Sequence, residues 1–230
     1  MREAEPLALS DCESVNAVVA SEHVAAFAAA CGAAVLAMST DYVFDGSATQ
    51  PIPPDARPAP LNVYGRTKWQ GEEAIRRCVP RHWIVRVSWL VGPHGRNFVE
   101  AIRARIAAAQ PLSVVDDQRG SPTFTFDLAP ALVELPDVAP PGTYHLANAG
   151  ECTWYEFAAA ILERAGGGVP LARTTTLEMN RPALRPAYSV LDTSATVRAL
   201  GRALPPWRDA LDRYGRSTRA EHPTRGASHV

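Results

Sequence analysis

The feature that most constrains the fold is an alternation of helix and buried-strand patterns in the first ninety residues. Residues 15–31 form an Ala-rich helical pattern that stops at Gly32, a residue suited to a helix C-terminus. Residues 33–39 form a short apolar run, residues 62–78 a second helical pattern, and residues 82–89 another apolar run. Short apolar runs that alternate with helices are typical of buried parallel strands. The alternation predicts an α/β fold with crossover helices.

The second half of the chain mixes shorter patterns of both kinds. Thr153 and Glu156 have capping-box spacing before an apolar run, which predicts the start of a helix. A long loop is expected over residues 45–60, and a polar, disordered tail over residues 216–230. Further helices are predicted over residues 98–109, 127–135 and 206–214, and strands over residues 112–116 and 143–147.

Composition narrows the class of partner. The 23 basic and 24 acidic side chains nearly cancel, so there is no electrostatic reason to expect nucleic acid or a membrane surface. No apolar stretch approaches the ~18 residues of a membrane span, and the charged first residues lack a signal-peptide core. We therefore expect a cytoplasmic protein. The four cysteines and six histidines show no ligand spacing, which predicts no metal site.

One lysine stands among 22 arginines, and it lies four residues after a tyrosine. Tyr64 and Lys68 fall on the second predicted helix, where this spacing places both side chains on one face. An adjacent ammonium favours the phenolate and lowers a tyrosine pKa from ~10, so that the phenol can act as a general acid. The pattern alone is weak, and a solvated helix face is the alternative interpretation.

The surrounding segments strengthen the catalytic interpretation. Residues 38–46 (MSTDYVFDG) lie where a buried strand runs out into a loop, and residues 86–92 (RVSWLVG) lie at the end of the next strand. In open α/β sheets, ligands bind beyond the carboxyl ends of the strands. We therefore expect the Thr40 hydroxyl to face the same reacting oxygen as Tyr64.

Taken together, STDYVFDG, NVYGRTK and RVSWLVG resemble the extended short-chain dehydrogenase/reductase superfamily, and within it the dTDP-4-dehydrorhamnose reductases. The resemblance continues to about Tyr214 and includes VDDQRGSPT, TWYEF, RPALRP, SVLDT and LPPW. It implies an α/β fold in which a partial Rossmann-type parallel sheet carries a smaller, interleaved substrate-binding lobe. It implies that residues 1–110 are the remaining part of a dinucleotide-binding domain and residues 111–215 mainly the substrate-binding lobe.

The resemblance also implies roles for single residues. Thr40, Tyr64 and Lys68 match the catalytic triad of the family. Tyr64 would protonate the sugar C4 oxygen while a nicotinamide hydride reaches that carbon, and Thr40 would hold the oxygen. Lys68 would lower the pKa of Tyr64 and hold the nicotinamide ribose, so Tyr64 and Lys68 are also the candidate residues for binding NADPH or NADH.

Four further positions match the family less directly. Asp41, Tyr42 and Trp89, together with Thr40, match residues around the sugar, although each of the three could instead serve packing. Asn16 matches an asparagine of a proton-relay set. The implied activity is NADPH-dependent reduction of dTDP-4-dehydrorhamnose to dTDP-L-rhamnose. The implied partner is the nucleotide sugar, with a homodimer as one option for the oligomeric state.

The chain departs from the family at its beginning. The family opens with a strand, a G-x-x-G-x-x-G turn and a helix that hold the pyrophosphate, and this sequence shows no such motif. Gly166-Gly167-Gly168 follows a helix instead. Met1 falls where the family enters the helix that ends at Gly32, so we expect the glycine-rich half to be missing. Three explanations stay open: a start placed inside a longer reading frame, a decayed gene fragment, or a non-catalytic binding protein.

Under the non-catalytic alternative, the chain resembles the reductase-like regulatory subunit of methionine adenosyltransferase, which has dispensed with its own cofactor site. Such a protein binds a partner or a nucleotide sugar without reducing it. Lys68 argues against this reading, because a pure binding module in an arginine-rich chain has little reason to keep a lysine there.

Overall fold

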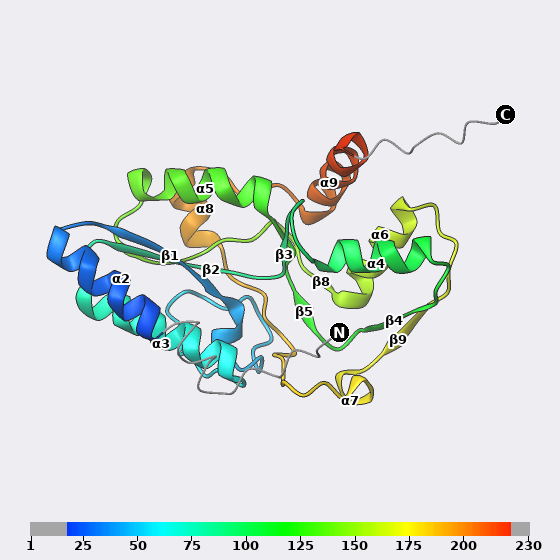
Figure 1. The fold of residues 1–230 in the computed structure, drawn as a ribbon, viewed down its shortest axis with the longest axis horizontal. Helices are drawn as coiled ribbons and strands as arrows, with labels where there is room; N and C mark the ends of the chain where they lie inside the picture. The colour runs from blue at the N-terminus through cyan, green and yellow to red at the C-terminus, as the bar shows by residue number, and fades with distance from the viewer. Residues whose placement is uncertain (1–17, 222–230) are drawn as a thin grey trace, which may run out of the picture.

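The computed structural model describes residues 18–221, and the predictions for Asn16 and for residues 15–17 lie outside this range. Figure 1 shows a sheet with helices on both faces, and a second group of helices and short strands beside it. The elements are α2 (Val18–Cys31), β1 (Val35–Thr40), η1 (Asp41–Val43), α3 (Val63–Cys78), β2 (His82–Val87), β3 (Leu90–Val91), α4 (Phe98–Ala107), β4 (Leu112–Val115), β5 (Arg119–Gly120), β6 (Thr123–Phe124), α5 (Thr125–Val138), β7 (Gly142–His145), β8 (Cys152–Thr153), α6 (Trp154–Arg164), β9 (Leu171–Thr174), α7 (Thr176–Met179), α8 (Ser194–Leu200) and α9 (Trp207–Glu221).

The central sheet is parallel, in the order β1-β2-β7, and its register pairs Val35 with His82 and Arg86 with His145. Side chains of β2 alternate between the two faces, as the pleat requires. Ile84 packs under α2 and α3, whereas Trp83 and Val85 pack under α5 and α8. The predicted α/β class and the partial Rossmann-type parallel sheet are confirmed.

In the second lobe, α6 packs against α4, against β4 of the parallel pair β4-β9 and against β8 of the antiparallel pair β5-β8. The predicted capping box is present, because the Thr153 hydroxyl accepts from the Glu156 N–H and the Glu156 carboxylate accepts from the Thr153 N–H. Helix α9 returns to this lobe and buries Trp207, Leu211 and Tyr214 in its core.

Helix α9 differs from the sequence-based expectation. It continues to Glu221 and so enters the segment predicted as a disordered tail, while residues 222–230 lie outside the described range. Its later residues are polar, and a polar composition does not prevent helix formation when an apolar turn before it is anchored. Among the described residues, no helix is both long and apolar enough to cross a membrane.

Candidate active site

The candidate site begins where β1 ends. Thr40 is the last residue of β1 and the N-cap of η1, and its hydroxyl oxygen accepts from the Tyr42 N–H at 3.2 Å. The same hydroxyl donates to Asp41 Oδ1 at 3.1 Å. Both side chains are buried, with Thr40 6% and Asp41 2% exposed. The strand end therefore fixes the Thr40 hydroxyl by two local hydrogen bonds.

Helix α3 reaches this strand end through a glycine. The helix is capped by Asn62, whose side-chain oxygen accepts from the Gly65 N–H at 2.8 Å. A Cβ on Gly65 would overlap the carbonyl oxygen of Tyr42, so only glycine permits this approach of helix to chain. The approach places the ring of Tyr64 edge-on to that of Tyr42, with 5.9 Å between centroids.

Tyr64 lies within reach of Thr40 but does not have the lowered pKa that the sequence predicts. Burial raises the pKa of Tyr64, the charge of Asp41 raises it further, and a side-chain hydrogen bond with Thr40 opposes both. Lys68 is not among the groups that shift this pKa, since its ammonium is directed elsewhere. Its Nζ donates to the carbonyl oxygen of Met38 on β1 at 2.9 Å.

Burial governs the other two charged groups at this site. It raises the pKa of Asp41 to about 6, against the opposing hydrogen bonds from Ser189 and Thr40. It also lowers the pKa of Lys68. Ser189 was not found from the sequence, because it reaches Asp41 only through the folding of a distant loop onto β1. The site thus places the Asp41 carboxyl, the Tyr64 phenol and the Lys68 ammonium at the end of β1.

Trp89 is placed apart from this group. It follows β2 with a left-handed backbone, φ 44°, which is strained for a bulky residue. Its indole stacks on that of Trp154 with centroids 3.6 Å apart, and a Cβ on Gly120 would come within 2.6 Å of it. The structure therefore brings Thr40, Asp41, Tyr42, Tyr64 and Lys68 together and seats Trp89 against the second lobe.

The residues at the strand end fit part of a nicotinamide cofactor. A lysine ammonium has three donors, and Lys68 uses one of them on Met38, which leaves donors for a ribose hydroxyl. Tyr64 remains 45% exposed, so its phenol can meet a ligand. For metals the finding is different: within residues 18–221, no cluster of His, Cys, Asp or Glu could hold an ion.

Comparison with known proteins places the chain. A family model described as "RmlD substrate binding domain" matches residues 4–219. The chain belongs to this family. An RmlD-type relative, dTDP-4-dehydrorhamnose reductase of Streptomyces griseus, is 42% identical over 196 residues, which cover 82% of this chain and 64% of that protein. The spore coat polysaccharide biosynthesis protein SpsK of Bacillus subtilis is 45% identical over 183 residues, covering 80% and 64%.

Solved RmlD-type structures share the fold. The dTDP-4-dehydrorhamnose reductase of Bacillus anthracis, crystallised with NADP, superposes with a TM-score of 0.83 at 36% identity and covers 88% of this chain and 72% of that one. The resemblance inferred from the motifs is therefore confirmed. The chain spans a little under two thirds of the length of the two curated relatives named above.

Proposed function

We propose that this chain carries the catalytic residues of an NADPH-dependent reductase that converts dTDP-4-dehydrorhamnose to dTDP-L-rhamnose. The observation that carries the proposal is the meeting of Thr40, Tyr64 and Lys68 at the carboxyl end of β1, in a chain of the RmlD family. Relatives with that activity in their names are 37–42% identical to this chain over the aligned residues.

The chemistry assigns each side chain a task. A reduced nicotinamide, when bound, supplies the hydride that reaches C4 of the sugar. Tyr64 gives its phenolic proton to the C4 oxygen, which becomes a hydroxyl. Thr40 turns its single O–H from Asp41 Oδ1 to that oxygen. The Lys68 ammonium, which donates to Met38, holds the nicotinamide ribose through its remaining donors.

Replacement of the phenol tests the proposal. Purified chain is mixed with NADPH and dTDP-4-dehydrorhamnose, and cofactor oxidation is followed by absorbance. Tyr64→Phe should reduce kcat about 10²–10⁴-fold, because the general acid is lost while the ring stays. Tyr155→Phe, in which the lost hydroxyl lies on α6, is the matched control and should turn over like the unchanged chain. Equal turnover of Tyr64→Phe and the unchanged chain would refute the assignment.

Binding separates this proposal from the non-catalytic alternative. Calorimetric titration with dTDP should show binding in both the unchanged chain and Tyr64→Phe. Binding of dTDP without any NADPH oxidation by the unchanged chain would support a nucleotide-sugar-binding protein instead.

We also propose a cytoplasmic location, because the three described cysteines, Cys31, Cys78 and Cys152, are free thiols, as is usual in a reducing compartment.

A further inference from the structure

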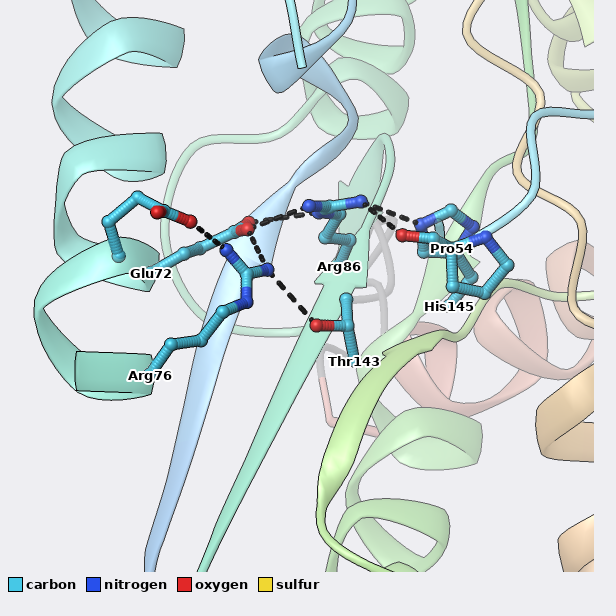
Figure 2. A network of polar contacts seen from close by, with 7 residues as sticks. Pro54, Glu72, Arg76, Arg86, Thr143 and His145 are labelled. Atoms are coloured by element: carbon cyan, nitrogen blue, oxygen red, sulfur yellow. Dashed lines mark hydrogen bonds and ion pairs between the residues drawn. The ribbon is translucent and has the colours of Figure 1, made fainter. Parts of the chain in front are cut away.

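A buried ion pair lies one helical turn beyond Lys68. Arg86 on β2 is 1% exposed and Glu72 on α3 is 3% exposed. The guanidinium donates to both carboxylate oxygens of Glu72, from Nε at 2.9 Å and from Nη2 at 2.7 Å. Its remaining nitrogen, Nη1, donates to the carbonyl oxygen of Pro54 at 3.0 Å. Figure 2 shows this two-pronged contact at the centre of a polar network.

Arg76 contacts the carboxylate of this ion pair, and His145 contacts its guanidinium. Arg76, one turn after Glu72, donates to Glu72 Oε2 at 2.8 Å and to Thr143 on β7 at 3.0 Å. His145 faces Arg86 at 3.5 Å, and burial together with the Arg86 charge lowers its pKa to about 3, so it is neutral. Two guanidinium groups therefore contact the Glu72 carboxylate. Burial acts to raise the pKa of Glu72, and the hydrogen bonds and charges around it outweigh burial and lower that pKa.

The position of Glu72 makes it the natural partner of Lys68. Tyr64, Lys68, Glu72 and Arg76 follow one another at four-residue spacing, so they form one stripe along α3. A lysine and a glutamate at this spacing form ion pairs on exposed helices. Here the Lys68 ammonium donates to Met38 instead, and within the described part of the chain it makes no ion pair.

We propose that Arg86 is a positioning residue for Lys68: by holding both oxygens of the Glu72 carboxylate, it prevents that carboxylate from pairing with the ammonium one turn away. Arg86 reaches the site only through Glu72 and touches neither Tyr64 nor Lys68. Lys68 is thereby left with donors for a ligand hydroxyl. The use made of those donors rests on the proposed function, whereas the charge arrangement does not.

The proposal predicts that two substitutions shift the pKa of Lys68 in opposite directions. Burial lowers the pKa of Lys68, and the negative charge of Glu72 acts against burial and raises it. Arg86→Met releases the carboxylate toward Lys68 and should raise the pKa of Lys68, because Arg76 still keeps Glu72 ionised. Glu72→Gln removes the negative charge and leaves Arg86 unpaired, so it should lower the pKa of Lys68.

The sequence makes this measurement simple, because Lys68 is the only lysine. Chain labelled with ¹³C at the lysine ε carbon gives one lysine signal, whose shift against pH reports this pKa without further assignment. The unchanged chain, Arg86→Met, Glu72→Gln and the double variant Glu72→Gln/Arg86→Met are titrated, with circular dichroism as the check on folding. Arg105→Met, an exposed arginine on α4, is the matched control and should leave the titration unchanged.

The outcomes are distinct. A higher pKa of Lys68 in Arg86→Met, a lower one in Glu72→Gln, and a return below the Arg86→Met value in the double variant support the proposal. A purely structural role would loosen the site and move both single variants upward, toward the ordinary lysine value. A rise in Glu72→Gln, or no change in Arg86→Met, overturns the proposal.

Instability of one variant does not remove the test. Arg86→Met leaves the buried Glu72 carboxylate with Arg76 as its one remaining guanidinium partner, so this variant is the one at risk of unfolding. The direction in which Glu72→Gln shifts the pKa of Lys68 then decides. The double variant is the reference for this shift, because it has no carboxylate to release. Since no substrate or cofactor is present, failure of the proposed reductase activity would leave these titrations unaffected, and the two proposals fail separately.

Discussion

Asp41 shows at the scale of one residue how burial makes stability depend on pH. Burial raises its pKa in the folded chain to about 6, from the ordinary value of 3.8. Between these values the folded state holds a proton that the unfolded state has lost. Stability therefore falls as the pH rises through this window, and the carboxyl costs about 3 kcal/mol above pH 6.

Asp41→Asn should remove this dependence. The variant should gain stability relative to the unchanged chain as the pH rises from 4 to 7, by about 3 kcal/mol over the window. Urea unfolding followed by circular dichroism at several pH values measures the difference. The comparison of the two chains is needed because His145 changes the stability in the opposite direction to Asp41. The pKa of His145 is lowered to about 3, so the fold becomes less stable as the pH falls below 6.5. Parallel stability curves for Asp41→Asn and the unchanged chain would contradict the prediction, and exposed Asp137→Asn is the control.

Single residues also show the reach of sequence reasoning. The spacing of Tyr64 and Lys68 predicted that both lie on one helix face. In the structure both are on α3, where Tyr64 reaches Thr40 and Lys68 donates to Met38 on β1. The direction of the Tyr64 pKa shift was wrong, because burial and the Asp41 charge are properties of the packed site that no spacing reveals. The contact of Ser189 with Asp41 was equally invisible, since it depends on how a loop far along the chain folds back.

At the scale of elements, the packing of α3 on the end of β1 depends on Gly65. Gly65→Ala would press a methyl group against the backbone of Tyr42, which cannot move as a flexible side chain would. We expect a loss of about 1–3 kcal/mol in stability. We also expect kcat to fall about 100-fold, because Tyr64 and Lys68 shift with the helix.

A second glycine provides the comparison for Gly65→Ala. A Cβ on Gly142 in β7 would meet nothing closer than 3.6 Å, so Gly142→Ala should change stability and turnover little. Urea unfolding and the NADPH assay measure both variants. Gly65→Ala with the stability and turnover of Gly142→Ala would show that α3 does not need this close approach.

The long elements were predicted, and so were the four-residue strands β4 and β7, whereas β9, α7 and α8 were not. Periodicity found α2, α3, β1 and β2 because each is long enough to repeat a pattern and buries one face. Strand β9 (LART) and helix α7 (TLEM) are as short as β4 and β7 but lack the apolar run that marked those strands. Helix α8 follows proline-rich turns, where its seven residues gave no signal. These elements take their places from tertiary contacts rather than from local preference.

At the scale of the whole molecule, α9 links its two lobes. Arg213 on α9 donates to both carboxylate oxygens of Asp127 on α5, at 2.8 and 2.7 Å. Asn148 donates to the same carboxylate at 2.8 Å and to the carbonyl oxygen of Pro205 at 2.9 Å. Tyr214, one residue along α9, is fully buried and donates to the carbonyl oxygen of Gly92 at 3.0 Å.

Arg213→Gln should therefore destabilise the whole chain. It leaves a largely buried Asp127 carboxylate without its cation, at a cost of about 2 kcal/mol. The urea midpoint should fall, while the same change at the exposed Arg105 should leave it in place. An unchanged midpoint in Arg213→Gln would mean that apolar packing of α9 alone holds the lobes.

The stacked pair of Trp89 and Trp154 joins the end of the sheet to the first turn of α6. Two indoles whose planes are 9° from parallel and 3.6 Å apart share their excited states. The coupling between the two indoles depends steeply on their separation. The near-ultraviolet circular dichroism of this protein therefore reports the distance between the sheet and the second lobe. A ligand that moves the second lobe toward the strand ends, or away from them, should therefore change the near-ultraviolet circular dichroism, and no added label is needed to detect it.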